Sequence, residues 1–166
     1  MTDFRALLGS GTTFAVTCEL VPGRGFRGKE LDSVFKFSEG ARDSGRVHAV
    51  SLTDNPGGNP AILTDEVARE LVATGVEVIM HFSLKDLNRG LVESRAYSLM
   101  RQGIRNLLVV SGDYPTAGAF GVSQPVFDLD SVGALALHAA AVGKRARSVL
   151  GLVRVNNFRR GFQPFK

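Results

Sequence analysis

Short apolar segments alternate along this chain with longer segments whose apolar residues recur at helical spacing. The expected strands are residues 13–20, 47–52, 76–82, 106–111 and 148–155. The expected helices are residues 28–44, 62–74 and 90–102, with a fourth that begins at Asp130 or Ser131. Strands separated by helices form right-handed βαβ units, so the sequence predicts an α/β fold with a parallel sheet. An eight-stranded barrel and an open doubly wound sheet both have this alternation.

The apolar positions also predict which side of each helix is buried. In the helix at 90–102, Leu91, Ala96 and Leu99 are expected to face the core. Glycines follow the helices where a left-handed C-cap is expected, at Gly45, Gly75, Gly103 and Gly143. No linker or low-complexity segment interrupts the chain, so residues 1–166 are expected to form a single domain.

Composition narrows the classes of function. The 166 residues are 44% hydrophobic with a net charge of +4, which is ordinary for a globular domain. No apolar segment is long enough to cross a bilayer and the N-terminus does not resemble a signal peptide, so the cytoplasm is the expected location. The basic residues form no continuous face interleaved with aromatics, so nucleic-acid binding is not expected. Cys18 is the single cysteine and the three histidines lie far apart, which speaks against a metal site.

Polar residues stand at or near the carboxyl end of every expected strand. In parallel α/β folds this edge of the sheet forms the ligand-binding face. The irregular stretch 112–127, which follows the fourth strand, is long enough to be suspected of binding a ligand. The residues at these ends that could do chemistry or hold a ligand are Glu19, Thr53, Asp54, Asn55, His81, Gly112, Asp113, Asn156 and Asn157.

Two carboxylates in this set have different sequence surroundings. Glu19 lies within the apolar segment 16–21, where burial of a carboxylate is costly and so indicates a function. Asp113 follows a glycine at a strand end. Such a pair can take different roles, with one carboxyl kept protonated by desolvation and the other ionised. This pattern suits proton transfer beside a cofactor, but it does not identify the cofactor. His48 and His138 are expected to be structural or exposed.

Five segments, taken together, resemble the methylenetetrahydrofolate reductase family. Residues 14–22 resemble the family's first strand, with its Glu followed shortly by Pro, and residues 50–55 resemble its second strand. His81 with the following 85–89 segment resembles the third. Residues 103–115 are the most specific, because they join a helix end, a strand and a Gly-Asp-x-Pro loop, and residues 126–132 match a subgroup. The resemblance runs in order over about residues 13–158.

The resemblance implies a fold, a reaction and a set of site residues. The fold is a (β/α)8 TIM-type barrel with FAD on its C-terminal face, and NADH or NADPH usually supplies electrons for hydride transfer to methylenetetrahydrofolate, giving methyltetrahydrofolate. By this resemblance the catalytic residues are Glu19, the general acid that helps open the methylene bridge of the folate, and Asp113, which lies near flavin and pterin. The matching cofactor-binding positions are Thr53, His81, Gly112, Asp113 and Asn156.

Two departures from the family bear on the site. Many members have Arg where this chain has Ser111, so a guanidinium contact to the flavin is either absent or supplied by another residue such as Arg89. A barrel needs eight βα units and about 250 residues, and this chain holds about the first five units. We therefore expect a portion of a longer enzyme. The alternatives are a partner chain that completes the barrel, or pairing of the chain with its own copy in a homo-oligomer.

Two other functions remain open at this stage. The chain could be a non-catalytic flavin-binding or assembly subunit of a larger redox complex. An unrelated barrel enzyme acting on a phosphorylated metabolite would explain the strand–helix alternation, but it would not explain the surroundings of Glu19 and Asp113.

Overall fold

The structure is a computed structural model, and it describes residues 4–118, 121–142 and 150–153. The elements, in chain order, are α1 (Phe4–Ser10), β1 (Thr17–Leu20), α2 (Lys29–Ser44), β2 (Ala49–Leu52), the 3-10 helix η1 (Pro56–Gly58), α3 (Thr64–Ala73), β3 (Val78–Ser83), α4 (Arg89–Arg101), β4 (Asn106–Val110), β5 (Ala117–Gly118), β6 (Gly121–Val122), α5 (Ser131–Val142) and β7 (Leu150–Val153).

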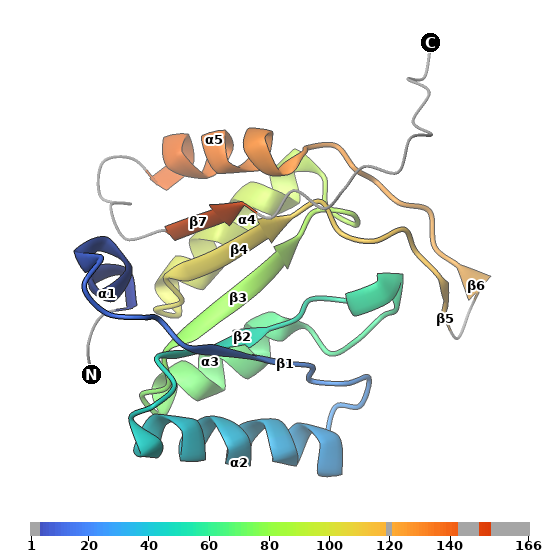
Figure 1. Cartoon of the computed structure of the whole chain (residues 1–166). Helices are drawn as coiled ribbons and strands as arrows, with labels where there is room; N and C mark the ends of the chain where they lie inside the picture. Colours follow the sequence, from blue (N-terminus) through green and yellow to red (C-terminus); the bar gives the residue numbers. More distant parts are fainter. Residues whose placement is uncertain (1–3, 119–120, 143–149, 154–166) are drawn as a thin grey trace.

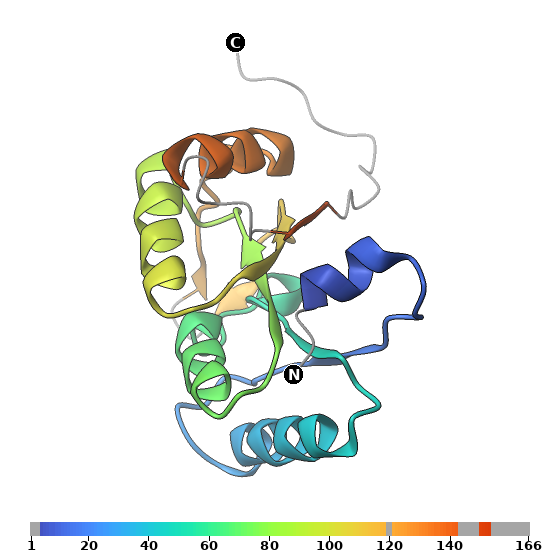
Figure 2. The ribbon, with the colours of Figure 1, turned by 90° about the vertical axis from the view of Figure 1, so that its left-hand side faces the viewer.

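A five-stranded parallel sheet runs through the described residues in the order β1-β2-β3-β4-β7, which is also the order of the strands along the chain. Helices α2 to α5 wrap one face of this curved sheet, and α1 lies on the other (Figures 1 and 2). A doubly wound sheet reverses its strand order at a switch point and carries crossover helices on both faces. The parallel α/β prediction is confirmed, and the sequential order is consistent with part of a barrel wall.

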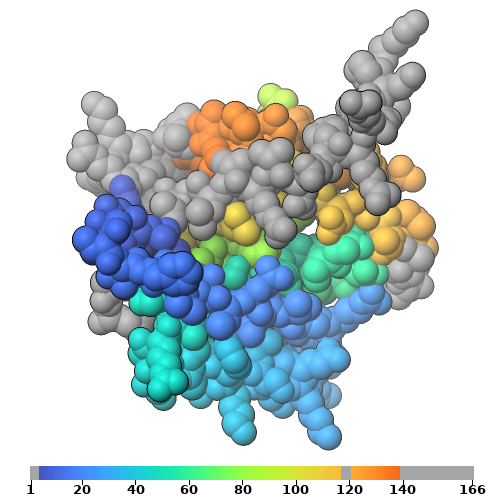
Figure 3. Space-filling view, in the orientation of Figure 1, coloured from blue at the N-terminus to red at the C-terminus, as the bar shows by residue number. Residues whose placement is uncertain are grey.

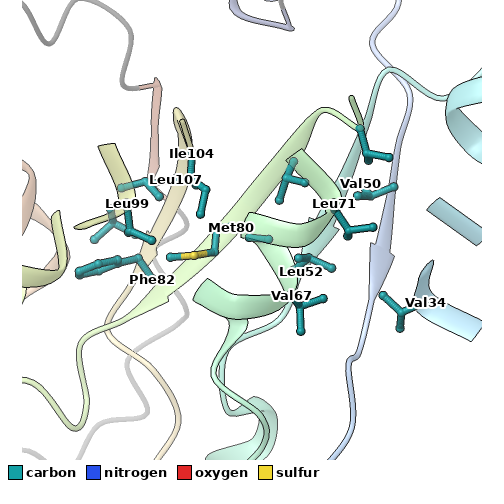
Figure 4. Packing of buried hydrophobic residues seen from close by; sticks show 14 of the residues in the cluster. Val34, Val50, Leu52, Val67, Leu71, Met80, Phe82, Leu99, Ile104 and Leu107 are labelled. Atoms are coloured by element: carbon teal, nitrogen blue, oxygen red, sulfur yellow. The ribbon is translucent and has the colours of Figure 1, made fainter. Parts of the chain in front are cut away.

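The main core lies between the sheet and the helices that wrap it. Side chains alternate across a strand, so every second residue of β2, β3 and β4 points towards these helices. Leu52, Met80 and Leu71 of α3 are fully buried between the two layers (Figure 4). Burial of one such side chain contributes about 1.5–3 kcal/mol, so the helix layer holds the sheet by hydrophobic contact.

On the opposite face of the sheet, called the inner face below, a helix packs only against one end in the described part of the chain. Phe4 and Leu7 of α1 pack on Ala49 and Ile79, near the amino ends of β2 and β3. A patch of the central strands, drawn in green and yellow, is visible above the blue N-terminal segment (Figure 3). The inner face near the carboxyl ends of the strands, where α1 does not reach, is therefore the place to look for a functional site.

Local signals predicted most element ends correctly. Gly45, Gly75 and Gly103 have φ values of 65°, 83° and 80°, as expected of left-handed helix caps, whereas Gly143 lies outside the described residues. The predicted face of α4 is wrong at its first position, because Val92 is 1% exposed and Leu91 is 50% exposed. The buried positions of α4 are in fact Val92, Ala96 and Leu99, which are four and three residues apart as one helix face requires.

Four short elements, α1, η1, β5 and β6, were not predicted, and strands β1 and β2 are shorter than expected. Helix α1 has no acidic residue in its first turn and no basic residue in its last, so it carries no charge signal for its ends. The stretch 112–127, expected to be irregular, contains the antiparallel pair β5–β6. Strand β1 occupies only the end of the expected segment 13–20. None of the described helices has the length and apolar character that crossing a membrane requires.

The helix layer predicts a clear contrast between two leucines. Leu71→Ala removes a side chain with 0% exposure, and we expect the free energy of unfolding to fall by about 2–5 kcal/mol. Leu91→Ala, the matched control on the exposed side of α4, should change it by less than about 1 kcal/mol. Urea unfolding followed by circular dichroism measures both, and equal losses would contradict the packing described.

Candidate functional site

Three polar side chains from neighbouring strands meet on the inner face of the sheet. Glu19 of β1 is the register partner of Ser51 on β2, and His81 lies on the next strand, β3. Ser51 Oγ lies 2.7 Å from His81 Nε2, and Glu19 Oε2 lies 3.9 Å from the same nitrogen. The arrangement is a short polar row in which one imidazole nitrogen faces both a hydroxyl and a carboxylate.

The expected desolvation of Glu19 is wrong for the described part of the chain. The Glu19 side chain is 57% exposed, while that of His81 is 13% exposed. The reason is strand alternation, because the apolar neighbours Cys18 and Leu20 point to the helix side while Glu19 points to the inner face. Glu19 is therefore accessible to a substrate and to water.

Asp113 joins the loops that follow β4 and β2. Its Oδ2 accepts a hydrogen bond of 2.9 Å from the backbone N–H of Gly57 in η1. A second contact runs from Thr116 N to Gly58 O at 3.1 Å. The loops are in such close contact that a Cβ on Gly58 would lie 1.9 Å from the carbonyl oxygen of Tyr114. Asp113 is thus an exposed carboxylate held by a backbone amide at the carboxyl end of the sheet.

Gly112 lies directly over the end of β3. Its φ is +89°, and a Cβ there would lie 2.3 Å from Ser83 Oγ and 3.0 Å from Lys85 Cβ. Ser83 Oγ is buried and has no hydrogen-bond partner among the residues that the structure describes. Glycine at this position lets the backbone approach β3 closely and leaves a buried hydroxyl beneath the loop.

Thr53 and Asp54, predicted as strand-end polar residues, are both buried. Thr53 Oγ1 donates to Leu20 O at 3.4 Å, which ties the end of β2 to the end of β1. Asp54 accepts hydrogen bonds from Ser83 N at 3.1 Å and from Arg95 at 3.0 Å. Asp54 is therefore occupied by internal contacts, whereas Thr53 lies at the boundary between the inner face and the loop.

Arg89, a candidate substitute for the missing arginine at position 111, is engaged elsewhere. Its guanidinium binds both carboxylate oxygens of Asp128, at 3.1 and 3.0 Å, and its backbone N–H donates to the same carboxylate at 2.8 Å. These hydrogen bonds lower the pKa of Asp128 from 3.8 to about 2. The pair attaches the end of the 112–128 segment to the start of α4. Asn156 and Asn157 lie outside the described residues.

The other histidines have structural surroundings. His48 Nδ1 accepts a hydrogen bond from Val16 N at 3.0 Å, at the opposite end of the sheet, where a cavity of about 230 Å³ also lies. His138 is buried with its ring edge-on to Phe82, and burial lowers the pKa of His138. Within the described ranges, no three Asp, Glu, His or Cys side chains gather as a metal site would require.

Sequence reasoning missed Ser51 and Ser83. Ser51 lies two residues before Thr53, within an expected strand, and only the pairing of β2 with β3 brings it to His81. One sequence signal does point to Ser51. Side chains of a strand alternate between its two faces, so residues 51 and 53 share a face. The register between β2 and β3 was also needed, and the local pattern of one strand does not give it.

The site offers hydrogen-bond donors and acceptors with an exposed carboxylate at each of two positions. Glu19 with Ser51 and His81 occupies the inner face, and Asp113 stands on the loops at the end of the strands. A ligand bound over this face would meet a carboxylate, a hydroxyl and an imidazole together. A family model described as methylenetetrahydrofolate reductase matches residues 8–152, which include all of these positions. No curated protein matches the chain.

The close contact under Gly112 predicts a packing cost beyond that of backbone conformation. Gly75 has nearly the same φ, +83°, but nothing lies within 4 Å of a Cβ there. Gly75→Ala should lower the free energy of unfolding by about 1–2 kcal/mol, and Gly112→Ala by about 2–5 kcal/mol, because the second also overpacks. Denaturant unfolding of both variants measures the difference. Similar losses would show that Ser83 and Lys85 move aside freely.

The Arg89–Asp128 pair predicts a dependence of stability on pH. The pKa of Asp128 is about 2 in the folded protein against an ordinary value of 3.8, so its stabilisation is present above about 3.8 and is lost as pH falls through about 2. The stability difference between the parent and Asp128→Asn should therefore shrink over this range. Urea unfolding at a series of pH values measures it, and a difference that stays constant would refute the pairing.

Proposed function

The chain belongs to the methylenetetrahydrofolate reductase family, and we propose that it reduces methylenetetrahydrofolate to methyltetrahydrofolate through a bound flavin. The observation that carries this proposal is the row of Glu19, Ser51 and His81 on the inner face, with Asp113 at the end of the strands. Hydride transfer to a folate needs a proton donor beside a surface that can hold two flat ring systems. An inner sheet face that carries an exposed carboxylate, Glu19, supports that requirement.

The chemistry of the described residues fits a flavin. The edge of a flavin ring presents both hydrogen-bond donors and acceptors, and Ser51, His81 and the loop backbone near Gly112 supply matching hydrogen-bonding groups. FAD is the flavin proposed, held by Thr53, His81, Gly112, Asp113 and, from the resemblance alone, Asn156. When bound, the flavin would supply the hydride, and NADH, NADPH or a redox partner would reduce the flavin again.

Glu19 is proposed as the proton donor to the folate. Its Oε2 lies on the inner face 3.9 Å from His81 Nε2, where it can protonate a bridge nitrogen and so favour opening of the methylene bridge. Because the side chain is 57% exposed, water can return a proton to it after each turnover. Ser51 and His81 orient the carboxylate, and Asp113 provides a negative charge near the reacting rings.

The remaining proposals concern the whole protein. The sequential parallel sheet supports a (β/α)8 barrel in which the chain contributes about the first five units. Completion of that barrel by further sequence, by a partner chain or by a second copy would surround the inner face. A cytoplasmic location is proposed because folate chemistry of this kind uses soluble pyridine nucleotides.

Glu19→Gln provides the direct test. The amide keeps the size of the side chain but cannot donate a proton as an acid, so folate reduction should fall about 10²–10⁴-fold while flavin binding is kept. Stopped-flow oxidation of the reduced flavin by methylenetetrahydrofolate measures the first quantity, and flavin absorbance titration measures the second. Glu39→Gln, at an exposed position on α2, is the matched control and should behave as the parent.

Each outcome distinguishes between functions. Normal folate reduction by Glu19→Gln would refute the proton-donor role. A parent protein that binds FAD tightly but never reduces folate would instead favour the alternative, a non-catalytic flavin-binding or assembly subunit of a larger redox complex. A parent protein that binds no FAD would overturn the proposal.

A further inference from the structure

A buried cluster of one guanidinium and two carboxylates lies behind the candidate site. The Arg95 side chain, from α4, is only 10% exposed. Its Nε donates to both carboxylate oxygens of Asp65 at 2.9 and 3.0 Å, and its Nη2 also bonds Asp65. Its Nη1 donates to Asp54 Oδ2 at 3.0 Å. Burial opposes the charge of Arg95, but its hydrogen bonds and the two carboxylates prevail and raise its pKa.

The cluster joins four elements. Asp65 is in the first turn of α3, Asp54 follows β2, and Arg95 is within α4. Asp54 Oδ2 also accepts the backbone N–H of Ser83 at the end of β3. The ring of Phe82 lies against the guanidinium, with 4.7 Å between the ring centroid and Arg95 Cζ. Only a planar fork with several donors can bind two carboxylates at once while stacking on a ring, which distinguishes Arg from Lys here.

Asp54 is also the second residue of the loop that follows β2 and meets Asp113. Asn55 follows it with a positive φ of 49°, and Asn55 Oδ1 accepts the N–H of Ala61 at 2.8 Å, which closes the loop. Between these points, Gly57 N donates to Asp113. The Asp54 side chain therefore fixes one end of a loop whose middle carries the amide that binds Asp113.

We propose that Arg95 is a positioning residue for the site. Arg95 holds Asp54, and Asp54 in turn holds the loop after β2. In this position the loop presents Thr53 to the inner face and the Gly57 amide to Asp113. Arg95 acts through Asp54 and does not touch the ligand. This role of Arg95 adds a residue behind the site to the proposed function. It rests on the proposed function only where its test measures FAD binding.

Arg95→Lys tests the proposal, because lysine keeps the charge but cannot bridge the two carboxylates. We expect amide exchange of Gly57 to rise about tenfold and the dissociation constant for FAD to rise about tenfold. Hydrogen exchange by NMR and flavin titration measure these quantities. In the double variant with Asp113→Ala, the loss of FAD affinity should be smaller than the sum of the two single losses, because Asp113→Ala already removes the acceptor for Gly57 N.

Arg69→Lys is the matched control. Arg69 lies on α3 in a half-exposed pair with Glu66, and its replacement should leave Gly57 exchange and FAD affinity unchanged. Thermal unfolding shows whether Arg95→Lys is folded. If it is not, Asp54→Asn is the second variant, because it keeps the side-chain shape and an acceptor for Ser83 N while removing the charge that holds Arg95.

The outcomes separate this proposal from the proposed function. A folded Arg95→Lys or Asp54→Asn variant with parental Gly57 exchange would overturn the positioning role. Strictly additive losses of FAD affinity in the double variant would do the same. If the parent protein binds no FAD, the proposed function fails, and Gly57 exchange alone still decides whether Arg95 holds the loop.

Discussion

Parallel pairing of β1 to β4 in chain order, with side chains alternating between two faces, determines where the rest of the molecule lies. One face, represented by Leu52 and Met80, is buried under the helices that connect the strands. On the other face, the inner face, the only helix contact described is that of α1 with the amino ends of β2 and β3. The row of Glu19, Ser51 and His81 thus occupies the part of the sheet that core packing leaves available.

The fold class could be predicted because its signals are local. Apolar periodicity and glycine caps are properties of consecutive residues, and Gly45, Gly75 and Gly103 adopt the expected conformation. The error at Leu91 has the same local origin. Leu91 and Val92 are adjacent apolar residues, and the spacing to Ala96 and Leu99 selects Val92 only when the helix phase is known.

The candidate site was harder to predict, since it depends on register and on contacts between distant residues. The apolar neighbours of Glu19 suggested a buried carboxyl, but in a strand the neighbours of a residue share the opposite face. Asp54 had the character of a ligand group, yet its partner Arg95 lies 41 residues further on. Which strand-end residues serve the structure and which face the ligand is decided by tertiary contacts that no local pattern contains.

The sequential strand order also has a consequence for how the protein is made. A chain emerging from the ribosome exposes β1, then β2, then β3, and each strand pairs with the one synthesised just before it. Every pairing among these strands joins neighbours in chain order, so none of them waits for a distant part of the chain. The exceptions are Asp54 and Asp65, whose shared guanidinium arrives 41 and 30 residues later. Strands β1 to β3 therefore emerge before the guanidinium that supports the site, and β4 and β7 emerge after it.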